Sequence, residues 1–294
     1  MIEVKDLTFT YQKNQGIQNI SFLVQPEESA VLLGSEGAGK TTILRTLMGF
    51  LKPERGYARL ADTDSFRFSG KAHQNVGYLA QESAFFPQSK GTSYLRFCAA
   101  YKGVKDKNRI RELLGKFELD ATDRISRMSL SERTKLGLVD ALLADPQILI
   151  LDEPTSGLEP AFLNRLVRYL KEEKQKGKCI LMASSDFAFS RQLADFAILM
   201  KEGNIVSQVD IADLEKQQTR TYEIEFETEG QLRDFCQEDW PVANITRRKL
   251  SVTLSGSPAR FLAALSKYSI LTLSSKPASL EDLFAQYFRK ETVL

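Results

Sequence analysis

The sequence contains few of the residues that build metal centres or disulfide frameworks. It has one histidine, His73, and three cysteines, Cys98, Cys179 and Cys236. Cysteines that are odd in number and far apart favour inert thiols in a reducing compartment over a disulfide framework or a metal site. His73 lies upstream of a predicted strand and is expected on the surface.

Long apolar runs and an excess of one charge are also lacking. No segment approaches the roughly 20 apolar residues that a membrane helix needs. The first residues, MIEVKDLTFTY, alternate like a strand and lack the apolar core of a signal peptide. The formal net charge of +2 gives no argument for nucleic acid binding. We therefore expect an intracellular chain that acts at a membrane only as a peripheral subunit.

Strands alternate with helices over the first two thirds of the chain, which indicates a largely parallel α/β sheet. Residues 87–144 are expected to be mostly helical. The predicted strands are 2–11, 17–25, 29–34, 75–81, 148–154, 179–185 and 196–208, and the predicted helices are 41–50 and 160–177.

The composition changes near residue 210, where IADLEKQQTR looks like a charged linker or a bridging helix. The elements beyond it follow the order β-α-β-β-α-β, which is a ferredoxin-like pattern. We expect a first domain over 1–209 and a small α+β domain over 210–294. The strands of the second domain are predicted at 221–227, 243–249, 250–256 and 269–275, and its helices at 229–238, 257–268 and 279–290.

The stretch GSEGAGKTT fits the phosphate-loop pattern G-x-x-x-x-G-K-[ST] and follows an apolar strand. Its glycines let backbone N–H groups wrap phosphates, and the helix that it opens adds positive potential. Lys40 supplies a charge to the β- and γ-phosphates, and the Thr41 hydroxyl can bind magnesium. Glu36 either points to solvent or lowers affinity, because it adds a carboxylate to an anion site. The nucleotide-binding candidates here are Gly34, Ser35, Glu36, Gly37, Ala38, Gly39, Lys40, Thr41 and Thr42.

Two carboxylates follow the apolar run ILIL. Asp152 ends the predicted strand, as a carboxylate that organises magnesium should. Glu153 can polarise an attacking water, or it can merely cap the following turn. Together with the phosphate loop, this pair predicts binding of ATP or GTP with Mg²⁺.

These motifs, in this order over residues 1–208, resemble the ATP-binding subunits of ABC transporters. Tyr11 resembles the aromatic residue that stacks on adenine, and Gln81 resembles the glutamine that contacts magnesium and the attacking water. The resemblance implies a P-loop NTPase fold with a mixed sheet and a helical subdomain near 87–144, followed by the ferredoxin-like α+β domain. It implies hydrolysis of ATP, with Glu153 and Gln81 as catalytic residues and Thr41, Gln81 and Asp152 as Mg²⁺ ligands.

The resemblance also implies that two nucleotide domains pair head to tail, each ATP lying between one phosphate loop and the partner's signature turn, usually L-S-G-G-Q. Counting back from Asp152 places this turn on MSLSE, where Ser129 keeps the serine and Ser131 stands for a glycine. Glu132 replaces the glutamine, so the turn is interpreted as weakened but present. A shifted register, Leu130-Ser131-Glu132, stays open. Ser129 and Ser131 are therefore nucleotide-contact candidates.

Two more positions depart from the family pattern. Ser185 stands where a histidine normally contacts the γ-phosphate. A hydroxyl can bond phosphate, but it carries no positive charge at neutral pH. Glu159 replaces an aspartate in SGLEP, which resembles the loop that crosses to the second subunit. Losing one positioned hydrogen bond to the γ-phosphate would slow turnover on the order of a hundredfold.

The end of the chain, ASLEDLFAQYFRK, resembles the closing helix of subunits that pair with ABC-2 permeases, although it could simply pack a core. Tyr94, Phe97 and Tyr101 either line a groove for a permease helix or fill the helical subdomain. The leading hypothesis is an ATPase subunit of an ABC-type exporter, peripheral on the cytoplasmic face of the membrane. Its partners would be a second nucleotide-binding subunit, self or unlike, and an integral permease, without nucleic acid.

Two alternatives to this hypothesis are kept. The first is a regulatory or degenerate ABC subunit that binds ATP, hydrolyses little and pairs with a competent partner. The second is a soluble ABC protein acting on ribosomes or DNA. Such proteins normally carry two nucleotide domains or a long coiled coil, whereas this chain has one phosphate loop and no heptad run.

Overall fold

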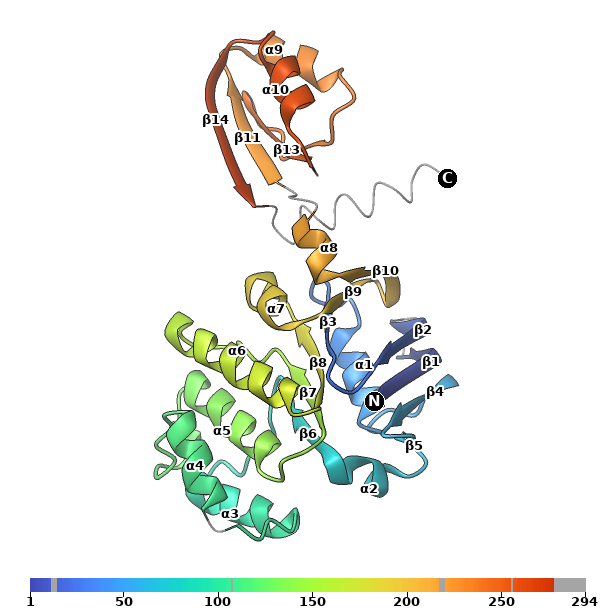
Figure 1. Ribbon diagram of the computed structural model, residues 1–294, viewed down its shortest axis with the longest axis vertical. Helices are drawn as coiled ribbons and strands as arrows, with labels where there is room; N and C mark the ends of the chain where they lie inside the picture. Colours follow the sequence, from blue (N-terminus) through green and yellow to red (C-terminus); the bar gives the residue numbers. More distant parts are fainter. Residues whose placement is uncertain (12–14, 107, 217–219, 255, 278–294) are drawn as a thin grey trace. The chain divides into compact units, whose positions relative to one another are not determined.

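The computed structural model describes residues 1–11, 15–106, 108–216, 220–254 and 256–277 (Figure 1). Contacts divide the chain into two compact units, Met1–Gln208 and Val209–Leu294. Among the described helices, none is both long enough and apolar enough to cross a membrane.

The first unit is built on a six-stranded sheet with the strand order β10-β9-β3-β8-β7-β6, in which β3, β6, β7, β8 and β9 pair in parallel. Every residue of β3, β7 and β8 is buried. Their continuous apolar runs are typical of parallel strands covered on both faces. The bounds are β3 Ser29–Leu33, β6 Val76–Leu79, β7 Ile148–Asp152, β8 Cys179–Ser184, β9 Phe196–Lys201 and β10 Asn204–Asp210.

A second, antiparallel sheet has the order β2-β1-β4-β5. Helix α1, Lys40–Leu47, packs against β2 and β4 of this sheet and against β7 and β8 of the first, so it lies between the two (Figure 1). The sequence analysis missed β4 and β5. The bounds are β1 Ile2–Thr10, β2 Gly16–Val24, β4 Arg55–Leu60 and β5 Thr63–Asp64, followed by the short helices α2 Ser69–Ala72 and η1 His73–Asn75.

The helices of the predicted helical region group together away from the antiparallel sheet (Figure 1). They are α3 Gly91–Tyr101, α4 Arg109–Lys116, η2 Ile125–Arg127 and α5 Leu130–Leu142.

Helix α6, Pro160–Gln175, begins with proline, which suits the first helical position because its missing N–H would be unpaired there. Helix α7, Phe187–Leu193, was not predicted. The predicted α/β architecture with a helical region is confirmed.

The second unit has the sheet order β12-β13-β11-β14, which is the ferredoxin-like arrangement expected. Its core contains Phe226, Phe235 and Phe261. The bounds are α8 Ile211–Lys216, β11 Arg220–Phe226, α9 Glu229–Cys236, β12 Val242–Ala243, β13 Lys249–Leu254, α10 Ala259–Leu265 and β14 Ile270–Pro277. The segment predicted as a linker or a bridging helix begins with helix α8, and the helix predicted at 279–290 lies outside the described residues.

Three expectations were wrong. The strand predicted at 196–208 is two strands, β9 and β10, because Glu202 (φ 48°) and Gly203 (φ 81°) form a left-handed turn between them. The strand predicted at 243–249 is reduced to Val242–Ala243, because Asn244 has a left-handed φ of 49° and Thr246 closes a turn onto the carbonyl oxygen of Lys249. His73 is half-buried, not on the surface. Its ring lies 6.4 Å from that of Phe50, between centroids, and burial lowers its pKa.

A buried ion cluster ties α6 to the start of β8. The ammonium of Lys178 pairs with the carboxylates of Glu173 and Asp145, and the side chains of Lys178 and Glu173 are each 2% exposed. Removing one partner of such a pair leaves a buried, uncompensated charge.

We therefore expect Lys178→Met to lower the free energy of unfolding by about 3 kcal/mol, measured by denaturant titration. Lys176→Met is the matched control, because Lys176 bonds the same carboxylate from a side chain that is 59% exposed. Its cost should stay below about 1 kcal/mol. Equal costs for the two variants would contradict the assignment.

Candidate functional site

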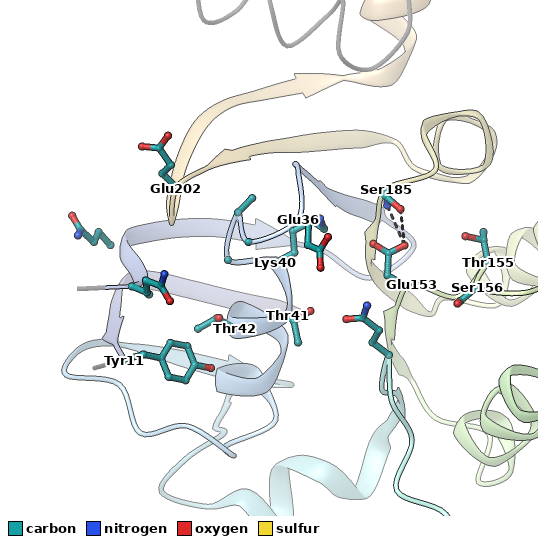
Figure 2. A pocket seen from close by; sticks show the side chains of 17 residues that line it. Tyr11, Glu36, Lys40, Thr41, Thr42, Glu153, Thr155, Ser156, Ser185 and Glu202 are labelled. Atoms are coloured by element: carbon teal, nitrogen blue, oxygen red, sulfur yellow. Dashed lines mark hydrogen bonds between the residues drawn. The ribbon is translucent and has the colours of Figure 1, made fainter. Parts of the chain in front are cut away.

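One pocket of the first unit, with a volume of about 920 Å³, gathers most of the predicted site residues. Tyr11 lies at one end and Glu153 with Ser185 at the other, with Lys40, Thr41 and Thr42 between them (Figure 2). The predicted residues that line it are Tyr11, Glu36, Gly37, Ala38, Gly39, Lys40, Thr41, Thr42, Gln81, Glu153 and Ser185. The predicted residues that do not line it are Gly34, Ser35, Ser129, Ser131 and Asp152.

The phosphate-loop motif connects β3 to α1 through close backbone approaches. Gly39 has a φ of 100°, and a Cβ there would lie 2.9 Å from Cγ2 of Ile17. A Cβ on Gly34 would lie 2.6 Å from the carbonyl oxygen of Met200. Helix α1 then begins at Lys40 without a side-chain cap or an acidic residue in its first turn. Its first N–H groups are therefore available to an anion.

The ammonium of Lys40 is held at the pocket by the loop itself. Its Nζ donates to the carbonyl oxygens of Gly34 (2.6 Å) and Ser35 (3.1 Å), and the side chain is buried. Lys40 forms no ion pair with a carboxylate within the described ranges. A phosphate entering the pocket thus meets a cation whose charge is not already neutralised.

Asp152 is a buried carboxylate that needs a positive partner. Neither of its oxygens has a hydrogen bond within the described part of the chain. Burial raises the pKa of Asp152 to about 6, while the nearby Thr41 hydroxyl and Lys40 favour the ionised form. The oxygen atoms of Asp152, Thr41 and Gln81 form the donor set that Mg²⁺ prefers, so these residues fit the ion.

Glu153 is held in an uncommon conformation beside β8. Its φ is 46°, in the left-handed region that non-glycine residues adopt mainly where the surroundings impose it. Its N–H donates to the carbonyl oxygen of Ala183 at 2.8 Å. Its Oε2 accepts hydrogen bonds from the backbone N–H and the hydroxyl of Ser185, both at 3.1 Å (Figure 2).

In the turn before α5, Ser129 and Glu132 form reciprocal hydrogen bonds. Ser129 is the N-cap residue, and its hydroxyl accepts a bond from the Glu132 N–H at 3.2 Å. In return, Oε2 of Glu132 accepts bonds from the N–H and the hydroxyl of Ser129, both at 2.8 Å, and these bonds lower the pKa of Glu132. This is a capping box. The helix starts at Leu130, directly after Ser129. The hydroxyl expected to meet phosphate is engaged by a carboxylate of its own chain.

Six lining residues escaped the sequence analysis. The turn Glu202-Gly203 reaches the pocket because Gly203 donates to the carbonyl oxygen of Ala38 and accepts from the N–H of Gln18. Such contacts between distant strands leave no local motif. Only Thr155 and Ser156 could have been found, since they directly follow Asp152-Glu153-Pro154. The six residues are Gln15, Gly16, Gln18, Thr155, Ser156 and Glu202.

Comparison with known proteins relates this chain to the ATP-binding proteins of ABC transporters. A family model described as ABC transporter matches residues 17–156. An ABC transporter ATP-binding protein of Bacillus subtilis is 32% identical over 223 residues, which cover 74% of each chain. A fluoroquinolone export ATP-binding protein of Mycobacterium tuberculosis is 26% identical over 294 residues, which cover 97% of this chain and 92% of that one.

A solved ATP-binding subunit of an ABC transporter has a similar fold. It matches with a TM-score of 0.68 and 24% identity, over 74% of this chain and 92% of that one. The predicted P-loop NTPase fold is confirmed.

The capping box yields a stability prediction. Ser129→Ala removes the side-chain acceptor for the Glu132 N–H, so the free energy of unfolding without nucleotide should fall by about 1 kcal/mol. Ser131→Ala is the matched control, because Ser131 lies in the same turn and its side chain makes no hydrogen bond among the described residues. It should change stability by less than about 0.5 kcal/mol. Denaturant titration of both variants tests this, and equal effects would contradict it.

Proposed function

This chain belongs to the ATP-binding proteins of ABC transporters, and from that premise we propose that it powers a separate integral permease in an exporter. As a member of this family it is an ATPase. The proposal rests on one observation: the phosphate-loop lysine and the anchored Glu153 line one pocket, and Asp152, whose oxygens have no hydrogen bond among the described residues, directly precedes Glu153. Export is supported by the Mycobacterium tuberculosis relative, a fluoroquinolone export ATP-binding protein that aligns with nearly the whole chain.

In this proposal the nucleotide runs along the pocket from Tyr11 to Glu153. The Tyr11 ring, which packs edge-on against Phe9 with centroids 4.8 Å apart, stacks on adenine. The loop from Gly34 to Thr42 and the free N–H groups of α1 hold the phosphates. Thr41, Asp152 and Gln81 would hold Mg²⁺, which neutralises charge that develops on the phosphates.

Glu153 is proposed as the base for the attacking water, and Gln81 orients that water. Attack forms a bond between the water oxygen and the γ-phosphorus and breaks the bond to the oxygen that leaves with ADP. The water proton passes to Glu153. Lys40, which pairs with no carboxylate in the described part of the chain, stabilises the charge on the transferred group.

A second nucleotide-binding subunit is proposed because Ser129 and Ser131 lie outside this chain's own pocket. At the start of α5 they would meet the nucleotide held by that subunit, and closure of the pair would drive transport. Contact would require the Ser129 hydroxyl to exchange its bond to Glu132 for one to phosphate. The alternative of a subunit with little hydrolysis is less well supported, since Lys40, Asp152 and Glu153 are all in place.

An exposed aromatic surface on and beside α3 is proposed to meet the permease. Phe97 is 58% and Tyr101 is 85% exposed, so neither fills the core of the helical region. Only Tyr94 is half-buried, and its hydroxyl bonds the carboxylate of Asp140 on α5 at 3.2 Å. Lys102 pairs with the same carboxylate at 2.7 Å. Movement of α3 would thus reach the last turn of α5, where Asp140 lies, and the subunit would act from the membrane surface.

The catalytic proposal predicts a concentration-dependent ATPase. At low protein, the steady-state rate should rise with the square of concentration if two copies close around ATP. Glu153→Gln should lower it by on the order of a hundredfold or more, the usual effect of losing a general base. Glu112→Gln, which removes an exposed carboxylate from α4, is the control and should keep the rate. Tight ATP binding with a wild-type rate no higher than that of Glu153→Gln would contradict self-sufficient hydrolysis.

The permease proposal predicts position-specific cross-linking in the cell. A photo-cross-linking amino acid in place of Phe97 should capture an integral membrane protein. The same replacement of Phe68, which is 61% exposed but lies outside α3, is the matched control and should capture none. Mass spectrometry identifies the adducts. Equal adducts at both positions, or adducts with soluble proteins alone, would contradict the assignment of this surface.

A further inference from the structure

Ser185 contacts the proposed base in a way that the sequence did not suggest. Both of its donors, the N–H and the hydroxyl, lie 3.1 Å from the same oxygen, Oε2 of Glu153. The other oxygen, Oε1, accepts no hydrogen bond from the described residues. One oxygen of the carboxylate is therefore clamped, and the other stays available at the pocket (Figure 2).

The residues on both sides of Ser185 are anchored. The buried Ser184 hydroxyl accepts a bond from the Asp186 N–H at 3.0 Å. Asp186 then caps α7, since its Oδ1 accepts a bond from the Phe189 N–H at 2.9 Å. The end of β8 is also fixed in register, because Ser184 pairs with Leu33 of β3. The position of Ser185, and with it the direction of the clamp, is thus set by β8 and α7.

The clamp has a chemical consequence for both residues. A hydroxyl has a single hydrogen to donate, so a Ser185 hydroxyl that donates to Glu153 does not donate to a phosphate. Both hydrogen bonds from Ser185 fall on one oxygen of the Glu153 carboxylate and so restrict its orientation. They leave Oε1 available to accept a hydrogen bond or a proton.

From this geometry we infer that Ser185 is a positioning residue for Glu153, not a contact of the γ-phosphate. The inference rests on the proposed ATPase function of the same pocket. In this inference, Oε1 of Glu153 accepts the proton of the attacking water, and Ser185 holds Glu153 in the orientation that this requires. The hydroxyl then supports hydrolysis only through Glu153.

A double-mutant cycle on the full chain tests the inference. The variants are Ser185→Ala, Glu153→Gln and the two combined, with single-turnover hydrolysis of Mg-ATP and the Kd for a fluorescent ATP analogue as readouts. Ser185→Ala should slow hydrolysis about tenfold, as expected for losing a hydrogen bond to a charged group. Its Kd should stay within about twofold. Residues that act through one another are non-additive, so adding Ser185→Ala to Glu153→Gln should slow hydrolysis no further.

Two more variants separate positioning from structure. Ser185→Thr keeps the hydroxyl and should retain a rate within about threefold of wild type. Ser190→Ala removes a buried hydroxyl whose one bond among the described residues is to the Asp186 carbonyl oxygen, at 2.7 Å, and should leave both readouts unchanged. A Ser190→Ala rate as low as that of Ser185→Ala would show a structural effect and overturn the inference.

Other results would overturn it in distinct ways. A weakened Kd in Ser185→Ala, with rate losses that multiply in the double variant, would show that the hydroxyl acts on phosphate. A wild-type rate in Ser185→Ala, with Glu153→Gln inactive, would defeat the inference and leave the proposed function standing. Absence of hydrolysis in the wild-type chain would defeat both.

Discussion

The parallel pairing of β3, β8 and β7 is the constraint on which the site depends. Leu33 of β3 lies beside Ser184 of β8, and Asp152 of β7 lies beside Ala183 of β8. Because parallel strands end at the same edge, the phosphate loop, Ser185 and the acidic pair emerge together, although they are more than 100 residues apart at the extremes. The buried apolar runs that hold these strands therefore also set the catalytic geometry.

Two charged side chains at this edge of the sheet, Lys40 and Asp152, lack, in the described part of the chain, the ion pair or hydrogen bonds that would normally compensate their burial. Among the described residues, Lys40 is held by carbonyl oxygens and forms no ion pair, and the buried carboxylate of Asp152 accepts no hydrogen bond. A magnesium nucleotide carries both complementary charges, since its phosphates suit Lys40 and its metal suits Asp152. A bound cation would favour the ionised form of Asp152 and so oppose the burial that raises its pKa to about 6.

Two serines expected to face phosphate contact carboxylates of their own chain instead. Ser129 bonds Glu132, and Ser185 bonds Glu153. The two pairs differ in origin. The first is a local helix cap, which a nucleotide would have to open. The second joins residues at the ends of β7 and β8 and orients a side chain in the pocket. Breaking this bond would leave the proposed base without a fixed orientation.

The sequence by itself determined the phosphate loop, the acidic pair, the α/β alternation and the ferredoxin-like order, because each depends on neighbouring residues. Backbone N–H groups wrap phosphates only as a contiguous loop, and periodicity is local. The capping box, Ser129-x-x-Glu132, was also readable from sequence but was overlooked. Tertiary structure alone decided the Ser185–Glu153 bond, the approach of Glu202 and the exposure of Phe97. These contacts join residues through strand register and packing, and no local pattern encodes them.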